Sequence, residues 1–154
     1  MEIIVGTNNQ GKLKEMQSGL KDPAIQLVSY RKYTTSQEQP AETGTTYAEN
    51  AYLKARFFQQ LIGRPVLGDD GGLTLTAFPD LLGIHTSRFF HSANPEEQNR
   101  EPVHLFEGQQ STRELTLSAT LVYVLDDDKL LQTEATLTGE LVEPRGTGGY
   151  GFDP

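Results

Sequence analysis

The fold is decided by one stretch near the middle of the chain, Pro65-Val66-Leu67-Gly68-Asp69-Asp70-Gly71-Gly72-Leu73-Thr74-Leu75. Its apolar start predicts a buried strand that ends at Asp69 and Asp70, and the glycines that follow allow a sharp bend of the chain. Two adjacent carboxylates at the end of a buried strand are costly unless a cation, a proton or several hydrogen-bond donors satisfy them. The segment is therefore interpreted as a metal site or a general-base site. The alternative is an Asp-Asp-Gly-Gly hairpin turn at the surface.

The composition narrows the classes of protein to which the chain can belong. Its 154 residues suffice for one domain, expected over residues 1–154, and the absence of cysteine excludes disulfides, cysteine metal ligands and a thiol nucleophile. A net charge of −8 argues against binding to a nucleic acid polymer. No apolar run reaches the roughly 20 residues of a membrane span, and the N-terminus lacks the pattern of a signal peptide. We expect a cytoplasmic protein without a membrane partner.

A candidate phosphate site follows the first predicted strand, residues 2–6. A polar loop, Thr7-Asn8-Asn9-Gln10-Gly11-Lys12, leads into a predicted helix from Leu13 to about Leu20. A strand, loop and helix in this order present backbone N–H groups and the positive helix end to phosphate. The spacing of Gly6, Gly11 and Lys12 matches the start of a P-loop, but Leu13 stands where Ser or Thr would ligate magnesium. The loop thus predicts a phosphate cradle whose metal is held elsewhere, or else a solvated turn.

A capping box predicts a second helix, because Thr46 is followed three residues later by Glu49. Asn50 and Lys54, four residues apart, share one face of this helix, and Gly63 is expected to end it. The apolar stripe consists of Tyr47, Ala51, Ala55, Phe58 and Ile62.

A long polar loop, from Tyr30 to Thr45, precedes this helix and contains Glu42. Loops of this length without their own structure are usually mobile or functional. Oxygen ligands from Glu42 and the Asp pair suit Mg²⁺, which takes one or two carboxylates and completes its shell with water and substrate phosphate. The alternative is that these side chains are only solvated.

The last third of the chain predicts more strands and a glycine-rich end. Residues 114–125 alternate, and residues 129–142 supply one long or two shorter strands that complete a sheet. The first of these segments places on one face Leu115, Leu117, Ala119, Leu121 and Tyr123. The chain closes on two aromatic residues and an aspartate that could stack on and hydrogen-bond a purine base, or pack beneath another element, in Tyr150-Gly151-Phe152-Asp153.

Four blocks of the sequence together resemble the inosine triphosphate pyrophosphatase family. They are Thr7-Asn8-Asn9-x-Gly11-Lys12-x-x-Glu15, Glu42-Thr43-Gly44-x-Thr46-x-x-Glu49-Asn50-Ala51-x-x-Lys54-Ala55, Asp69-Asp70-x-Gly72-Leu73 and Gly146-Thr147-Gly148-Gly149-Tyr150-Gly151-Phe152-Asp153-Pro154. The resemblance implies an α/β fold with an elongated, mixed central β-sheet flanked by helices, and a homodimer. It also implies Mg²⁺-dependent hydrolysis of ITP, dITP and XTP to the monophosphate and pyrophosphate. Alternatives are a pyrophosphatase for modified pyrimidine nucleotides and a nucleotide-binding module with impaired catalysis.

Carried over residue by residue, the resemblance assigns roles to the site. Asp70 would be the base for the attacking water with Asp69 beside it, Glu42 and Asp70 would hold Mg²⁺, and Lys54 would neutralise phosphate. Contacts to the substrate are implied for Thr7, Asn8, Asn9, Gln10, Gly11, Lys12, Asn50, Gly71, Tyr150, Gly151, Phe152 and Asp153.

The sequence departs from the family pattern at three places. Gly71 stands where the family usually has Ser, and the family's Ser-Ala-Arg-Tyr block reads as a shifted Ser87-Arg88-Phe89. The family also continues beyond the Asp-Pro that ends this sequence, so we expect the chain to lack a C-terminal segment that helps to read the base.

Overall fold

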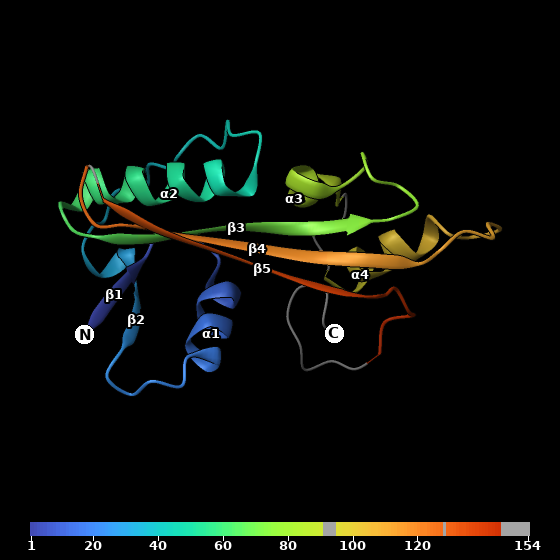
Figure 1. Ribbon diagram of the computed structural model, residues 1–154, viewed down its shortest axis with the longest axis horizontal. Coiled ribbons are helices and arrows are strands. Elements are labelled where there is room, and N and C mark those ends of the chain that lie inside the picture. Colours follow the sequence, from blue (N-terminus) through green and yellow to red (C-terminus); the bar gives the residue numbers. More distant parts are fainter. Residues whose placement is uncertain (91–94, 128, 146–154) are drawn as a thin grey trace. The chain divides into compact units, whose positions relative to one another are not determined.

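A computed structural model describes residues 1–90, 95–127 and 129–145 of the chain (Figure 1). Five strands form a mixed sheet in the order β2-β1-β3-β4-β5. The strands are β1 Glu2–Val5, β2 Gln26–Ser29, β3 Val66–Leu75, β4 Glu114–Val124 and β5 Leu130–Glu140. The helices are α1 Gln10–Gly19, α2 Tyr47–Ile62, α3 Thr86–Phe89 and α4 Pro95–His104, with 3-10 turns at Tyr30–Lys32 and Gly83–His85. None of the described helices is long and apolar enough to cross a membrane.

The sheet is mixed because helices connect β1 to β2 and β2 to β3, whereas a short turn connects β4 to β5. β1 pairs in parallel with both β2 and β3, as expected where helices connect the strands. β4 and β5 are neighbours joined by a short turn, in which the Leu125 N–H donates to the Lys129 carbonyl at 3.0 Å, so they run antiparallel. The α/β class with a mixed sheet and flanking helices is as the sequence predicts.

The described contacts divide the chain into two compact units. The first comprises residues 1–70 and 119–135, and the second comprises residues 71–118 and 136–154. Strands β3, β4 and β5 each contribute residues to both units.

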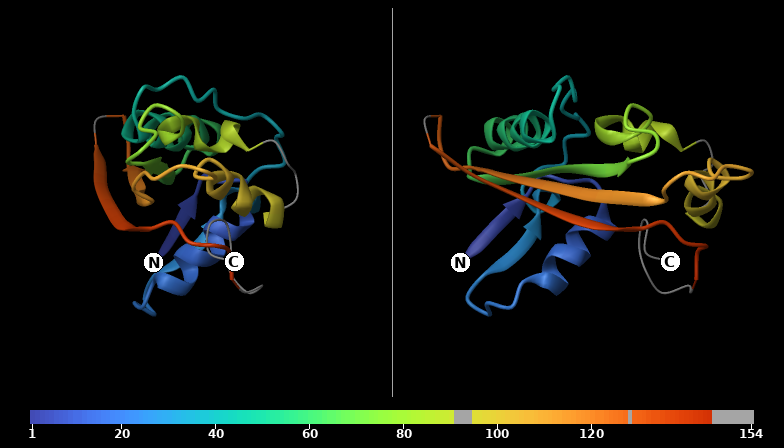
Figure 2. Two further views of the ribbon diagram at one scale, coloured as in Figure 1. Left: turned by 90° about the vertical axis from the view of Figure 1, so that its right-hand side faces the viewer. Right: turned by 45° about the vertical axis from the view of Figure 1, so that its right-hand side comes forward.

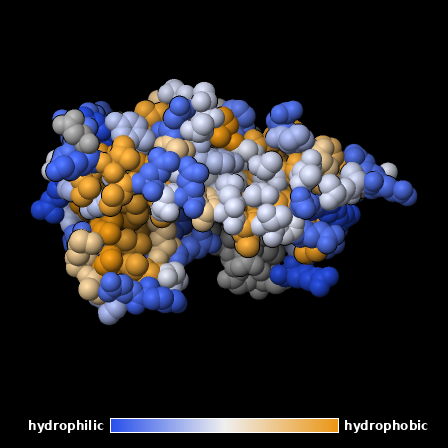
Figure 3. Space-filling view, viewed as in Figure 1, coloured by the Kyte–Doolittle hydropathy of each residue, from blue (hydrophilic) through white to orange (hydrophobic). Residues whose placement is uncertain are grey.

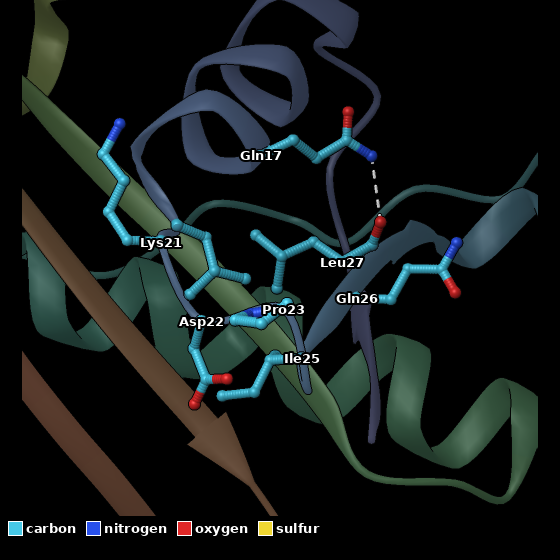
Figure 4. A pocket seen from close by; sticks show the side chains of 8 residues that line it. Gln17, Lys21, Asp22, Pro23, Ile25, Gln26 and Leu27 are labelled. Atoms are coloured by element: carbon cyan, nitrogen blue, oxygen red, sulfur yellow. Dashed lines mark hydrogen bonds between the residues drawn. The ribbon is translucent and has the colours of Figure 1, made fainter.

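In the first unit, helices cover both faces of the sheet, with α1 and α2 on opposite sides of β3 (Figure 1). Ile4 packs with Tyr30, Phe58 and Val66 against α2. Its neighbour Val5 points to the other face and packs with the α1 cluster, because side chains alternate along a strand. α1 lies against β2 (Figure 2), where the side-chain amide of Gln17 donates to the Leu27 carbonyl at 2.9 Å, a bond drawn in Figure 4.

The second unit has its own core. Leu73 and Leu75 from β3 pack there with Leu82 and Phe106. The Thr86 hydroxyl, at the start of α3, accepts from the Leu73 N–H at 3.1 Å and lies 3.2 Å from the Leu73 carbonyl. These contacts of the Thr86 hydroxyl link α3 to β3.

Hydrophobic side chains gather at the surface over β1 and β2 on the face shown in Figure 3. A contiguous apolar surface of this kind is typical of an interaction face.

The path of β3 and the start of α1 differ from the expectations from the sequence. β3 does not end at Asp70 or bend at the glycines, but continues to Leu75, and neither Gly71 nor Gly72 has a positive φ. Pairing with β1 is confined to Val66 and Leu67, and β4, the neighbour on the other side, keeps the strand extended beyond them, so the surface hairpin is also wrong. α1 begins at Gln10 rather than Leu13, because Asn9 caps it.

The burial pattern of β4 is a further finding of the structure. Its fully buried side chains are Thr120, Val122 and Val124, whereas the alternate set with Leu121 and Tyr123 is only partly buried. Val122 and Val124 pack against Ala51 and Ala55 of α2.

Candidate active site

The polar loop between β1 and α1 is organised by hydrogen bonds to its own backbone. The Asn9 carboxamide oxygen accepts from the N–H groups of Gly11 at 3.0 Å and Lys12 at 3.2 Å. The Thr7 hydroxyl, which is buried, accepts from the Asn9 N–H at 3.2 Å. Several N–H groups at the helix start are therefore already bonded, and a phosphate must exchange with these bonds or use neighbouring groups.

Lys12 reaches from α1 to β3. Its Nζ lies 2.7 Å from Oδ2 of Asp69, a residue only 4% exposed. The other oxygen of this carboxylate, Oδ1, is buried and accepts no hydrogen bond from the described residues. A buried charged oxygen without a donor is unfavourable, so this position favours a bound ligand that supplies one.

A second group of charges lies around Lys54 of α2. Its Nζ lies 2.8 Å from Oε1 of Glu42, 3.4 Å from Oδ1 of Asp70 and 3.1 Å from the carbonyl oxygen of Asp69. The side chains of Lys54 and Asp70 are 15% and 13% exposed, whereas that of Glu42 is 39% exposed. The structure thus brings together three of the residues to which the sequence assigns chemistry.

The ammonium of Lys54 stays charged in this setting. Burial by itself would lower its pKa. The hydrogen bond to Glu42 and the negative charges of Asp70, Glu42 and Asp69 outweigh burial and raise the pKa of Lys54 above its ordinary value of 10.5.

Asp69 and Asp70 point to opposite faces of β3, because consecutive side chains of a strand alternate. Leu67, two residues before Asp69, packs with the α1 cluster, whereas Gly68, two residues before Asp70, faces α2. Each carboxylate accordingly has its own lysine. Asp69 and Asp70 are adjacent in the chain, as the resemblance implies, but their carboxylates lie on different faces of the strand.

Asn50 and Glu49 hold the loop that carries Glu42. The buried Asn50 carboxamide oxygen accepts from the Gly44 N–H at 2.8 Å, and Oε2 of Glu49 accepts from the Thr45 N–H at 2.6 Å and hydroxyl at 2.9 Å. These bonds lower the pKa of Glu49 below its ordinary value of 4.5. Gly44 is required, because a Cβ there would lie 2.7 Å from the Asn50 oxygen. The predicted capping box is present, with Thr46 accepting from the Glu49 N–H at 3.1 Å.

Sequence reasoning missed a set of contacts on the phosphate loop. The Asn8 carboxamide oxygen accepts from the Arg31 guanidinium at 3.0 Å and from the Tyr30 hydroxyl, and its NH₂ donates to Gln39. Arg31 also donates to the Ser36 carbonyl at 2.7 Å. These contacts tie the long polar loop to Asn8. The signal available in the sequence was the unusual length of that loop.

The fit to a divalent cation rests on Glu42 and Asp70. Both reach one ammonium, so both can reach one metal ion, and two carboxylates with substrate phosphate form a usual Mg²⁺ shell. No group of three or more His, Cys, Asp or Glu residues that could hold a metal occurs in the described ranges. The predicted base-binding residues, Tyr150, Gly151, Phe152 and Asp153, lie outside the described residues.

Two surface hollows occur in the described part of the chain, and the paired lysines and carboxylates line neither of them. One of about 440 Å³ is lined by residues from the end of α1 to β2, among them Lys21, Asp22 and Ile25 (Figure 4), and includes none of the predicted site residues. Another of about 260 Å³ lies between Thr43–Gly44 and α2, beside Tyr52.

The sequence is similar to those of known proteins. The dITP/XTP pyrophosphatase of Deinococcus radiodurans is 35% identical over 155 residues, which cover 99% of this chain and 74% of that protein. A dITP/XTP pyrophosphatase of Thermus thermophilus is 32% identical over 159 residues, which cover all of this chain and 74% of that protein.

Two solved structures are similar to this chain in fold. A HAM1 protein from Coxiella burnetii superposes with a TM-score of 0.82 at 32% identity, covering all of this chain and 80% of that one. The Staphylococcus aureus Ham1 protein superposes with a TM-score of 0.77 at 26% identity, covering all of this chain and 79% of that one. The model of the Ham1 family matches residues 3–154. By sequence and by fold, the chain belongs to the Ham1 family.

Proposed function

We propose that the chain is a nucleoside triphosphate pyrophosphatase. Its substrates are non-standard purine nucleotides (dITP, XTP and ITP), which it converts to the monophosphate and pyrophosphate. The observation that carries the proposal is the pair of lysine–carboxylate groups on the two faces of β3, Lys12 with Asp69 and Lys54 with Glu42 and Asp70. Hydrolysis of a phosphoanhydride needs mainly positioning and neutralisation of charge, and these groups can supply both.

In this proposal, Lys12 and Lys54 contact the phosphates, and Glu42 and Asp70 would hold Mg²⁺. The metal supplies neutralisation of the charge that develops on the phosphate oxygens. Asp70 accepts a proton from water as the water oxygen bonds to phosphorus of the α–β anhydride. The P–O bond of that anhydride breaks, and pyrophosphate and the monophosphate leave as the two products.

The remaining predicted residues support this arrangement from the loops. Asn50 and Glu49 position Glu42 through Gly44 and Thr45. Thr7, Asn8, Asn9, Gln10 and Gly11 shape the phosphate loop, and Gly71 offers its backbone N–H to the substrate. Tyr150, Gly151, Phe152 and Asp153 are proposed to meet the base.

The test is a pyrophosphate-release assay with dITP, XTP, dGTP, dATP and a panel of modified pyrimidine triphosphates. Release from dITP and XTP well above that from dGTP and dATP is expected, and removal of Mg²⁺ with EDTA should stop the reaction until the ion is restored. A higher rate with a modified pyrimidine would replace the purine assignment. Binding without turnover would make the chain a nucleotide-binding module.

We further propose that the protein works as a homodimer in the cytoplasm, where the nucleotide pool is located. The apolar surface over β1 and β2 supports a dimer (Figure 3). Light scattering coupled to gel filtration should give twice the chain mass, and a monomer mass at micromolar concentration would contradict the proposal.

A further inference from the structure

We propose that Lys54 closes the metal site while no nucleotide is bound, by holding its ammonium between the two carboxylates, Glu42 and Asp70, that would bind Mg²⁺. The inference rests on the proposed function, but its test needs no catalysis. It makes the entry of metal depend on the arrival of the nucleotide.

The contacts of Lys54 account for all the hydrogens of its ammonium. An ammonium has three N–H donors, and three oxygens surround this one: Oε1 of Glu42 at 2.8 Å, the carbonyl of Asp69 at 3.1 Å and Oδ1 of Asp70 at 3.4 Å. The ammonium thus supplies the positive charge that a metal would otherwise supply to Glu42 and Asp70.

Metal and ammonium cannot both occupy this place. An Mg²⁺ ion held by Oε1 of Glu42 and Oδ1 of Asp70, the oxygens that Lys54 contacts, would compete with the ammonium for the same electron pairs, since Mg²⁺ takes oxygen ligands at about 2.0–2.1 Å. Two cations this close repel strongly at sites that are mostly shielded from water, and Lys54 and Asp70 are 15% and 13% exposed. Binding of the metal therefore requires Lys54 to leave.

A triphosphate gives Lys54 a new partner. Its phosphate oxygens carry several negative charges and can accept the same three hydrogens, which frees Glu42 and Asp70 for the ion. Nucleotide and metal then favour each other's binding, and such coupling is reciprocal. Without nucleotide, the site should bind metal weakly.

Lys12 offers a matched comparison. It is also a lysine paired with an aspartate of β3, but its Nζ contacts Asp69 at 2.7 Å on the opposite face of the strand. Removal of Lys12 deletes one positive charge nearby without emptying the place between Glu42 and Asp70.

The test measures Mn²⁺ binding by the nucleotide-free protein. Binding is detected as a decrease in the electron paramagnetic resonance signal of free Mn²⁺. Lys54→Met should bind Mn²⁺ at least about tenfold more tightly than wild type, because a competing cation is gone. Lys54→Arg, which keeps the charge, should stay near wild type, and Lys12→Met should change the affinity by less than about threefold. Addition of Glu42→Gln to Lys54→Met should abolish the gain in Mn²⁺ affinity.

Circular dichroism checks that each variant is folded, and Lys54→Gln replaces Lys54→Met if the latter fails to fold. Equal or weaker Mn²⁺ binding by the Lys54 variant overturns the inference, as does the absence of measurable Mn²⁺ binding in both proteins. An equal gain in Mn²⁺ affinity in Lys12→Met would also overturn the inference. The change in net charge, and not the position of Lys54, would then explain the tighter binding. Hydrolysis of dITP by wild type is measured separately, so failure of the proposed function is recognised independently.

Discussion

Gly68 of β3 lies close against the backbone of α2, and its replacement by alanine tests how that contact positions the site. A Cβ at this position would overlap the carbonyl oxygen of Ala51 and lie 2.8 Å from the amide nitrogen and 3.0 Å from the Cβ of Ala55. Real Cβ atoms essentially never come within 3.0 Å of such atoms. Because the obstacles are helix backbone, no rotation of a side chain relieves the overlap, and α2 must move away from β3.

The expected loss of stability follows from this overlap with the helix backbone. Overpacking of a core typically destabilises by about 1–3 kcal/mol, and a collision with backbone belongs at the upper end, so we expect Gly68→Ala to lower the free energy of unfolding by about 3 kcal/mol. Asn50 and Lys54 directly precede Ala51 and Ala55, so they move with the helix. A misplacement of about 1 Å can cost about a hundredfold in rate, so kcat for dITP should fall by about tenfold to a hundredfold.

The assays are urea unfolding followed by circular dichroism, and turnover of dITP at saturating Mg²⁺. Gly139→Ala is the control, since it also places alanine in a strand but has no neighbour within 4 Å of the added Cβ. If Gly68→Ala matches wild type within about 0.5 kcal/mol and retains full turnover, the account of the β3–α2 contact is refuted.

Three further predictions concern single side chains. Asp70→Asn should reduce dITP turnover at least about a hundredfold, since the proposed base is lost, with little change in the far-ultraviolet circular dichroism; retention of full activity would remove the assignment. Lys12→Ala should weaken triphosphate binding in calorimetry more than nucleoside binding, and lower the free energy of unfolding by about 1–3 kcal/mol because Asp69 stays buried without its partner. Glu49→Gln should lower the urea midpoint at pH 6. Since the folded pKa of Glu49 lies below 4.5, its contribution is present above that pH and is lost as the pH falls through the folded pKa. The variant should therefore show a shallower acid decline between pH 6 and pH 3, and an identical decline would argue against the role of Glu49.

The second helix shows how far local signals reach. Thr46 with Glu49 predicts its start, Gly63 its end and the apolar stripe its buried face, and the structure agrees at each point because these interactions lie within one segment. Gly63 has φ 65°, which a glycine adopts without strain.

The central strand shows where local signals fail. The Asp-Asp-Gly-Gly sequence at 69–72 favours a turn, yet its place beside β4 in the sheet keeps β3 extended through it. That single error also concealed the opposite orientations of Asp69 and Asp70, because the alternation of side chains applies only to a continuous strand.

Contacts between distant segments could not be predicted from local patterns. Asn8 and Arg31 are 23 residues apart in the chain, and nothing in either segment indicates the other. The grouping of Lys54 with Glu42 and Asp70 followed from the family resemblance, not from spacing. β4 was difficult for another reason: both of its faces carry apolar residues, so alternation alone did not identify the face with Val122 and Val124 as the more deeply buried one.

The measurement that tests the central claim most directly is a ³¹P nuclear magnetic resonance time course of dITP with the wild-type chain and Mg²⁺. The account predicts that the three triphosphate signals give way to those of a monophosphate and pyrophosphate in equal amounts, with no diphosphate intermediate. Release of single phosphate with accumulation of dIDP, or a spectrum that does not change, would contradict it.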